Sequence, residues 1–312
     1  MKLAFLFPGQ GSQKVGMVHS LYEKYDSVKR LVHEADETLG FSISKMMFEG
    51  PDSELMKTEF TQPAILTASV AAWTVLKEHG IEADVAAGHS LGEYSALVAA
   101  GAVSFSDAVK TVHLRGRFMQ EAVPLGEGGM AAVIGLTPEK IVEICEMVSK
   151  AEGPVQAVNF NCPGQVVIAG ETGAVEKACE ELKAAGARRA IMLKVSAPFH
   201  SSLMEPAAVR LKEVLDSIVI NDTRIPVVAN VNAQEETKAE DIRKNLVDQA
   251  AHPVHWEESV RNMIANGVDY AVEVGPGTVL SGFMRKIDRS ITCFHAEDVA
   301  TIDETVAALK GE

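Results

Sequence analysis

A short run in the first third of the chain, Gly88 to Gly92, has the residue types and spacing of a serine nucleophile. It reads Gly-His-Ser-Leu-Gly and fits the GxSxG pattern. We expect a strand over Asp84–Ala87 before it and a helix from Leu91 after it. Glycines beside the serine permit the tight turn that exposes its hydroxyl, and N–H groups at the helix start can stabilise an oxyanion. The pattern predicts that Ser90 is a nucleophile; the alternative is an ordinary glycine-rich turn in which Ser90 caps the helix.

A nucleophilic serine needs a base, and His200 is the histidine best placed to supply one. It lies in the run Ser196–Ser202, which follows an expected strand over Arg189–Val195 and precedes an expected helix. Loops at strand ends commonly display catalytic groups. His89 adjoins the serine, where neighbouring side chains point apart, and four others lie in expected helices: His19, His33, His79 and His113. We predict His200 as the base, against the alternative of a helix-capping or fully hydrogen-bonded histidine.

Alternating helices and strands must position these two residues. Helical patterns over Gln62–His79 and Phe105–Glu121 flank the strand before the serine. This rhythm is typical of a parallel sheet covered by helices. Later strands are expected at Ile225–Ala229 and Tyr270–Val274, the second followed by Gly-Pro-Gly and a helix from near Thr278. The sequence predicts an α/β fold with a hydrolase-like main domain and a mainly parallel sheet.

A glycine-rich break over Pro124–Gly129 introduces a different pattern. The elements that follow are a strand at 130–134, a helix at 138–149, a strand at 155–159, a turn at 163–164, a strand at 165–169, a helix at 173–185 and a strand at 189–195. The order βαββαβ is that of a ferredoxin-like unit. We therefore predict a ferredoxin-like subdomain over residues 127–196, inserted into a discontinuous catalytic domain made of residues 1–126 and 197–312.

Composition excludes several classes of protein. The chain has 312 residues with 29 Lys and Arg against 43 Asp and Glu, a net charge of −14, which argues against a general nucleic-acid binder. Its apolar start, Met1 to Phe7, is too short for a signal peptide, and no run approaches the length of a membrane span. The four cysteines are scattered and no ligand spacing is convincing, so we expect neither disulfides nor a metal site. We expect a soluble, cytoplasmic protein without membrane or nucleic-acid partners.

Seven motifs in order along the chain resemble those of the acyltransferase family of fatty acid and polyketide synthesis, in particular its malonyl-transferring members. They are Phe7-Pro-Gly-Gln-Gly-Ser-Gln13, Thr61-Gln-Pro63, Gly88-His-Ser-Leu-Gly-Glu93, Arg115-Gly-Arg-Phe-Met-Gln120, Asn159-Phe-Asn-Cys-Pro-Gly-Gln165, Phe199-His200 and Val274-Gly-Pro-Gly277. The likeness runs nearly from end to end, which a single GxSxG match would not provide.

The resemblance implies a ping-pong reaction. Ser90 would take malonyl from malonyl-CoA as an ester, His200 would remove its proton, and malonyl would pass to the phosphopantetheine thiol of acyl carrier protein. The family's oxyanion N–H groups fall on Gln10 and Leu91. The acceptor for the imidazole N–H is a backbone carbonyl, which falls on Gln249, so we expect the Gln249 side chain to matter little. The coenzyme A thioester is a substrate, and no cofactor is expected.

The resemblance also assigns residues that contact the acyl group. Arg115 matches the arginine that binds the free carboxylate of malonyl, a task suited to a guanidinium because it forms two parallel charge-assisted bonds. Phe199 matches the bulky residue associated with malonyl rather than methylmalonyl. Gln62 and Asn159 match positions that line the cleft, although polar groups that merely tie loops together are an equal alternative for both.

An acidic enzyme must attract two acidic partners through local basic patches. We hypothesise that two clusters flank the cleft and receive the carrier protein; they comprise Arg188, Arg189 and Lys194, and Arg285, Lys286 and Arg289. Two other functions stay open. A serine hydrolase or thioesterase shares GxSxG but should lack a carboxylate-binding arginine, and an idle scaffold that docks carrier proteins would not need both Ser90 and His200. We expect a monomer, and the sequence does not distinguish fatty acid from polyketide carriers.

Overall fold

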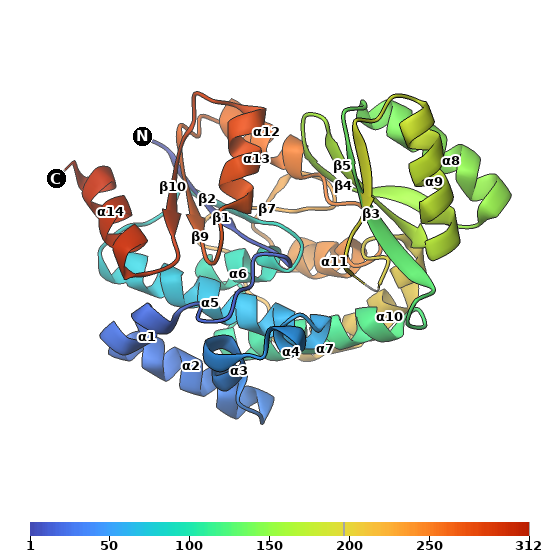
Figure 1. Cartoon of the computed structure of the whole chain (residues 1–312). Helices are drawn as coiled ribbons and strands as arrows, with labels where there is room; N and C mark the ends of the chain where they lie inside the picture. The colour runs from blue at the N-terminus through green and yellow to red at the C-terminus, as the bar shows by residue number, and fades with distance from the viewer. Residues whose placement is uncertain (196, 312) are drawn as a thin grey trace.

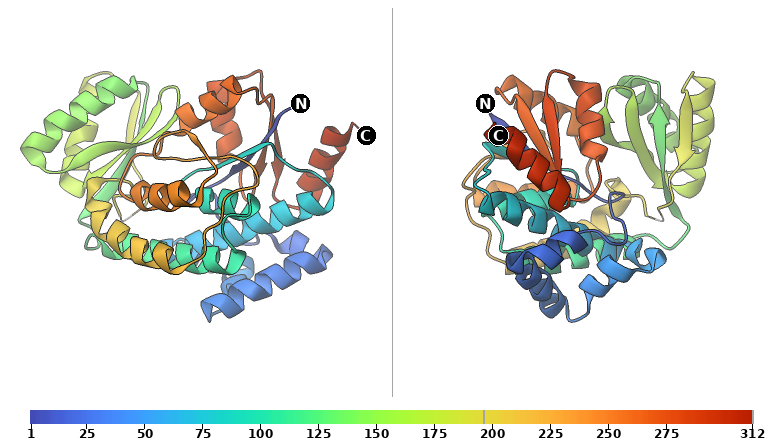
Figure 2. Two further views of the ribbon diagram at one scale, coloured as in Figure 1. Left: turned by 180° about the vertical axis from the view of Figure 1, so that it is seen from behind. Right: turned by 60° about the vertical axis from the view of Figure 1, so that its left-hand side comes forward.

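The computed structural model describes residues 1–195 and 197–311, and in it two β-sheets stand side by side (Figures 1 and 2). Ser196, at which the predicted subdomain ends, and Glu312 lie outside the described residues. The predicted α/β class, with a mostly parallel sheet and a small antiparallel one, is confirmed. The division of the chain into two domains stays a prediction.

The larger sheet is parallel except for one edge strand. Its order is β10 (Thr292–Ala296), β9 (Tyr270–Val274), β1 (Leu3–Phe7), β2 (Val85–Gly88), β7 (Val227–Val228) and β8 (Glu235–Glu236). Only the pairing of β7 with β8 is antiparallel. The central strands β1 and β2 are buried along their whole length, as expected for parallel strands covered on both faces.

The two faces of this sheet are covered by different helices. Side chains alternate along β1, so that Phe5 and Phe7 face the larger helical layer while Leu6 faces α12 (Trp256–Ala265) and α13 (Val279–Ile287). The helices of the larger layer are α1 (His19–Lys24), α2 (Asp26–Leu39), α3 (Ile43–Glu49), α4 (Asp52–Leu55), α5 (Thr58–Glu78), α6 (Gly92–Ala99), α7 (Phe105–Glu121), α10 (Glu205–Ser217), α11 (Ala239–Gln249) and α14 (Val299–Lys310). A single 3₁₀ turn, Ser202–Met204, precedes α10.

The smaller sheet has the order β4 (Val155–Cys162), β5 (Gln165–Glu171), β3 (Gly128–Ile134) and β6 (Arg189–Met192), and all its pairings are antiparallel. Helices α8 (Pro138–Glu152) and α9 (Thr172–Ala184) bury their apolar sides against it and form its outer layer (Figure 1). The chain order βαββαβ is the one that we predicted from the sequence.

Several element boundaries differ from the sequence predictions, and each difference has a physical cause. The predicted strand over Ile225–Ala229 is reduced to β7, because Pro226 has no N–H for the ladder. The helix predicted from Gln62 begins earlier, at Thr58, as α5. It contains Pro63, which has no N–H and so leaves the carbonyl of Glu59 without its helical donor. His113 Nδ1 lies 2.8 Å from that carbonyl oxygen and donates to it.

Two strands were not predicted, and one ends early. Strands β8 and β10 lie at the two edges of the large sheet, where a partly exposed pattern gives a weak signal. Strand β6 ends at Met192 rather than at the predicted Val195, and its last hydrogen bond to β3 runs from the Leu193 N–H to the Met130 carbonyl. Within the described ranges, none of the helices combines the length and the apolar character needed to cross a lipid bilayer.

Candidate active site

The predicted strand-to-helix turn carries Ser90 between β2 and α6. Its backbone is left-handed, with φ of 54°, as a tight nucleophile turn requires. A Cβ on Gly88 would overlap the carbonyl of Gly92, and a Cβ on Gly92 would overlap the carbonyl of Phe7. Both glycines are therefore needed because backbone packs directly against backbone on each side of the serine.

Ser90 and His200 meet in a hydrogen bond, although 110 residues separate them in the chain. Ser90 Oγ lies 2.7 Å from His200 Nε2, and His200 Nδ1 lies 2.7 Å from the carbonyl oxygen of Gln249. A carbonyl only accepts, so Nδ1 carries the proton and Nε2 is left to accept from the serine hydroxyl. Burial, and then the positive charge of Arg115, lowers the pKa of His200 to about 3. The imidazole is neutral near pH 7, as a base for the serine must be.

The two residues whose backbone N–H groups the resemblance assigns to the oxyanion hole, Gln10 and Leu91, both lie close to the serine in the structure. Leu91 is the first residue before α6, and Gln10 lies in the loop after β1 that lines the same pocket as Ser90. This loop packs tightly on the nucleophile turn, since a Cβ on Gly9 would overlap the carbonyl of His89. In the described part of the chain, neither the Gln10 N–H nor the Leu91 N–H has an intramolecular acceptor.

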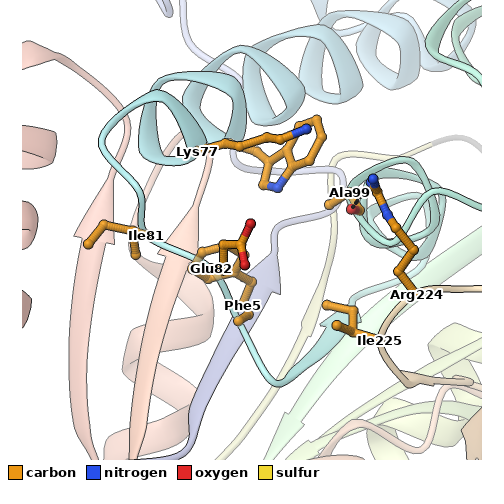
Figure 3. Close-up of a pocket in the computed structure, with 9 residues that line it drawn as sticks. Phe5, Lys77, Ile81, Glu82, Ala99, Arg224 and Ile225 are labelled. Atoms are coloured by element: carbon orange, nitrogen blue, oxygen red, sulfur yellow. Dashed lines mark hydrogen bonds between the residues drawn. The ribbon is translucent and has the colours of Figure 1, made fainter.

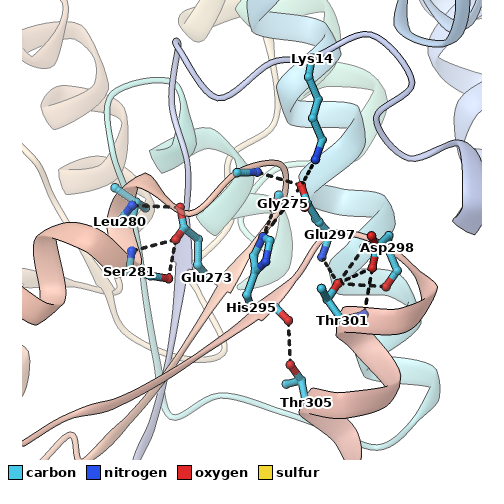
Figure 4. Close-up of polar contacts among 11 residues, drawn as sticks. Lys14, Glu273, Gly275, Leu280, Ser281, His295, Glu297, Asp298, Thr301 and Thr305 are labelled. Atoms are coloured by element: carbon cyan, nitrogen blue, oxygen red, sulfur yellow. Dashed lines mark hydrogen bonds and ion pairs between the residues drawn. The ribbon is translucent and has the colours of Figure 1, made fainter.

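A polar cluster at the carboxyl end of the large sheet anchors this loop (Figure 4). Glu297 Oε2 pairs with Lys14 Nζ at 2.8 Å and accepts the N–H of Gly277 at 2.9 Å. The buried carboxylate of Glu273 accepts N–H groups from Leu280 and Ser281, at the start of α13. The loop that contains Gln10 is thereby joined to the Gly-Pro-Gly turn after β9.

Arg115 extends from α7 into the same pocket and is only 1% exposed. Its Nη1 donates to Gln62 Oε1 at 2.8 Å, and its Nη2 donates to Ser90 Oγ at 3.1 Å and Gln249 Oε1 at 2.7 Å. The guanidinium lies over the Tyr94 ring, and its Nε has no partner within the described residues. Burial lowers its pKa. Throughout the described chain this buried cation forms hydrogen bonds only to neutral groups, which leaves it able to accept an anionic partner.

The Gln249 side chain makes contacts that the resemblance did not imply, while the expectation that it matters little for activity stays a prediction. This residue is fully buried, and its amide nitrogen donates to the Ser90 carbonyl and to Glu93 Oε2, each at 2.9 Å. Its amide oxygen accepts from Arg115, while its backbone carbonyl holds His200. One residue therefore contacts the nucleophile, the base and the buried cation, and its side chain is part of the site.

Sequence reasoning missed two residues that brace the nucleophile turn. Asn230 Oδ1 accepts the Ser90 N–H at 2.7 Å, and Asn230 Nδ2 donates to the Gly88 carbonyl at 2.7 Å. Glu93 Oε2 accepts the Asn230 N–H at 3.1 Å. Asn230 had a usable signal, because it is a polar residue two positions after β7. Glu93 is the last residue of the motif Gly88-His-Ser-Leu-Gly-Glu93, but no role was predicted for its side chain.

The remaining predicted pocket residues lie where the resemblance implied. The pocket around Ser90 has a volume of about 110 Å³, and its wall includes Gln62, Asn159, Phe199, Met119, Met130, Leu193 and Val195. Gln62 contacts Arg115 directly, while Asn159 Oδ1 is buried without a partner among the described residues. A neighbouring hollow of about 310 Å³ shares Gln10, His89, Asn159 and Leu193 with this pocket and continues toward α13. Together they form a cleft between the two sheets.

The predicted basic clusters lie partly at one end of the small sheet. Gln165, Ile134 and Arg189 are paired in register across β5, β3 and β6. Lys286 Nζ reaches Gln165 Oε1 at 3.4 Å, so Lys286 and Arg189 lie at the same end of that sheet. Arg285 precedes Lys286 in α13, Arg188 precedes β6, and Lys194 follows Leu193 of the cleft wall.

A separate hollow of about 280 Å³ lies between the end of α5 and the large sheet (Figure 3). Lys77, Glu82 and Arg224 line it, and all three are exposed. Its lining contains no serine, cysteine or histidine, so it does not repeat the Ser-His arrangement of the pocket around Ser90. Nor does the described chain bring three or more His, Cys, Asp or Glu side chains together as a metal site.

Comparison with known proteins identifies close relatives. A family model described as the acyl transferase domain matches residues 4–305. The chain is 51% identical over 311 residues to the malonyl CoA-acyl carrier protein transacylase of Bacillus subtilis (strain 168), which covers 100% of this chain and 98% of the relative.

Solved structures agree with the sequence relatives. The crystal structure of an acyl carrier protein S-malonyltransferase from Vibrio cholerae matches with a TM-score of 0.95 at 47% identity, over 98% of this chain and 100% of that chain. A malonyl-transacylase in complex with a type II PKS acyl-carrier protein matches with a TM-score of 0.96 at 45% identity, over 100% of both chains. The resemblance seen in the motifs is confirmed, and the chain belongs to the acyl transferase domain family.

Proposed function

We propose that this chain transfers malonyl from malonyl-CoA to the phosphopantetheine thiol of acyl carrier protein, and so supplies extender units for fatty acid synthesis. One observation carries the proposal. A serine bonded to a neutral histidine shares its pocket with a buried guanidinium that has no carboxylate partner in the described chain. The first feature suits acyl transfer, and the second suits an acyl group that ends in a carboxylate. Relatives named as malonyl transacylases along the whole chain support the same reaction.

In the first half-reaction, Ser90 Oγ attacks the thioester carbonyl while its proton passes to His200 Nε2. The N–H groups of Gln10 and Leu91 stabilise the oxyanion, and the imidazolium returns its proton to the departing coenzyme A sulfur. A backbone carbonyl stabilises imidazolium less than a carboxylate does, but a thioester is already an activated acyl donor. In the second half, the carrier thiol gives its proton to His200 and its sulfur attacks the carbonyl carbon of the malonyl ester. The ester C–O bond then breaks, and His200 returns the proton to Ser90 Oγ.

Arg115 selects malonyl by binding its free carboxylate. A hydrogen bond to a charged group contributes about 1.5–3 kcal/mol, which corresponds to roughly 10- to 150-fold in specificity. Acetyl would leave the cation unpaired in a buried site, which adds to the discrimination. Phe199 narrows the pocket and so disfavours a branched acyl group.

The pantetheine arms of coenzyme A and of the carrier protein enter through the hollow between α13 and the small sheet. Lys286 contacts Gln165 in the wall of this hollow, and Lys194 follows Leu193, another residue of that wall. Together with Arg188, Arg189 and Arg285, these positive charges would attract acidic partners to an enzyme of net charge −14. We further propose that the protein acts as a cytoplasmic monomer that needs no cofactor and binds no nucleic acid or membrane. Its described cysteines are all free thiols, which suits a reducing compartment.

Incubation with radiolabelled malonyl-CoA in the absence of an acceptor tests the proposal. After denaturation, label should remain on the wild-type protein, be absent from Ser90→Ala and be reduced in Arg115→Ala. Addition of carrier protein should then discharge the label onto the carrier. Release of free malonate without any retained label would favour a hydrolase, and the absence of all turnover would favour a scaffold.

A further inference from the structure

Two buried carboxylates lie behind the acyl pocket. Glu93, in the first turn of α6, is 0% exposed, and Glu236 of β8 is 6% exposed. In each, Oε2 is hydrogen-bonded: Glu93 Oε2 accepts from Asn230 and Gln249, and Glu236 Oε2 accepts from Asn245 Nδ2 at 2.6 Å. In each, Oε1 is buried without a partner among the described residues. Two ionised carboxylates with bare buried oxygens are costly, and protonation of one of them lowers that cost.

Electrostatics supports protonation of one of the two carboxylates near neutral pH. Burial, and then the charge of Glu236, raises the pKa of Glu93 to about 8. Burial raises the pKa of Glu236 to about 7. Like charges in one buried site resist simultaneous ionisation, so near neutral pH the pair carries about one negative charge.

The pair is connected to the acyl pocket through one amide. The Gln249 nitrogen faces Glu93 and the Ser90 carbonyl, both acceptors, so its oxygen must face Arg115. Which way an amide points is decided by such a network. Glu93 therefore sets the orientation of the acceptor that holds Arg115, without touching the guanidinium itself.

Few other titratable groups face the pair. Arg115 of α7 favours the ionised form of Glu93, whereas Asp241 of α11 disfavours that of Glu236. Burial raises the pKa of Tyr94 well above its ordinary value, and His200 titrates near 3. The carboxylate pair is thus the group in this network that changes its charge near pH 7–8.

We propose that Glu93 is a positioning residue that holds Arg115 through Gln249, and that the carboxylate pair of Glu93 and Glu236 takes up a proton when the carboxylate of a substrate binds Arg115. The inference rests on the proposed function, in which malonyl places its carboxylate there. Once Arg115 is neutralised, it no longer stabilises the charge of the pair. The substrate carboxylate stays ionised, and the proton comes from solvent past Glu236, on the edge strand β8. Acetyl has no carboxylate and causes no uptake.

Calorimetry tests this coupling directly. Ser90→Ala protein, which cannot be acylated, is titrated with malonyl-CoA and with acetyl-CoA at pH 7.5 in two buffers of different ionisation enthalpy. The coenzyme A groups are common to both ligands, so their protons cancel in the difference. If the midpoint of the pair rises by about one pH unit from near 7.5, malonyl-CoA binds about 0.4 proton more than acetyl-CoA. Equal uptake for the two thioesters would overturn the proposal.

Variants assign the proton to the pair. Glu93→Gln, made in the Ser90→Ala background, should abolish the difference in uptake, whereas the exposed neighbour Glu235→Gln should retain it. Retention in a folded Glu93→Gln protein would contradict the proposal. If Glu93→Gln does not fold, Glu236→Gln takes its place under the same criterion.

Kinetics of the wild-type enzyme give an independent readout. For the same rise in midpoint, KM for malonyl-CoA should increase about sixfold from pH 7 to pH 9, while KM for acetyl-CoA stays level. Parallel pH profiles for the two thioesters would refute the coupling. If the wild-type protein never retains malonyl on Ser90, the proposed function itself fails; retained label without a proton difference defeats only the role of the pair.

Discussion

Replacing Gln249 with leucine tests whether a buried amide, rather than the backbone alone, organises the pocket. Leucine has a similar volume and carries no charge, and the carbonyl that holds His200 remains. The change removes amide hydrogen bonds to Arg115 at 2.7 Å, to the Ser90 carbonyl at 2.9 Å and to Glu93 at 2.9 Å. Arg115 Nη2 would then retain only Ser90 Oγ as a partner.

The magnitude follows from the bond to the guanidinium. A hydrogen bond to a charged group is worth about 1.5–3 kcal/mol, so poorer placement of Arg115 should lower kcat/KM for malonyl-CoA about 10- to 150-fold. Acetyl-CoA does not use the cation, and its kcat/KM should fall less than about tenfold. Selectivity for malonyl over acetyl should therefore shrink.

The assay compares the acylation rates of the two thioesters for wild type, Gln249→Leu and the control Asp248→Asn, which changes a neighbouring side chain that pairs with Lys244 at 3.0 Å. The control should behave as wild type. An equal loss for both thioesters would mean that the variant disturbs His200 instead, and no loss for malonyl-CoA would confirm the expectation that this side chain matters little.

Three further predictions concern the turn, the base and the docking surface. Gly92→Ala should abolish labelling of Ser90 or prevent folding, because the added Cβ overlaps the Phe7 carbonyl. The control Gly173→Ala, where the added Cβ contacts nothing, should match wild type in thermal unfolding and labelling assays. His200 has a pKa of about 3, below its ordinary value of 6.5, because the folded protein buries the neutral imidazole. Its contribution to stability is therefore full above pH 6.5 and is lost as the pH falls from 6.5 toward 3. Over that range the Tm of the wild-type protein should decline more than the Tm of His200→Asn. The double variant Arg189→Glu, Lys286→Glu should raise KM for carrier protein at least several-fold. The control Glu139→Lys, a charge reversal of opposite sign on α8, should not raise it. Unchanged carrier kinetics in the double variant would contradict the docking hypothesis.

The sequence predicted the elements around the nucleophile because their signals are local. In a GxSxG run between an apolar strand and a helix, the residue types indicate the backbone conformation of that same segment. The structure has β2, the turn and α6 in those positions. The βαββαβ order could likewise be predicted because each of its elements has its own hydrophobic periodicity within a short segment. Prediction failed at the edge strands β8 and β10, since partly exposed strands have no strong alternation.

The sequence by itself determined the fold class, the Ser90 and His200 pairing hypothesis and, through family motifs, the choice of Arg115. Only the tertiary structure decided what holds these groups in place. Asn230 contacts Ser90 across 140 residues, and Gln249 contacts Glu93 across 156. Such contacts arise because a parallel sheet brings the carboxyl ends of distant strands to one edge, and no local pattern encodes which polar side chains will meet there. The contacts of the Gln249 side chain were not predicted for that reason.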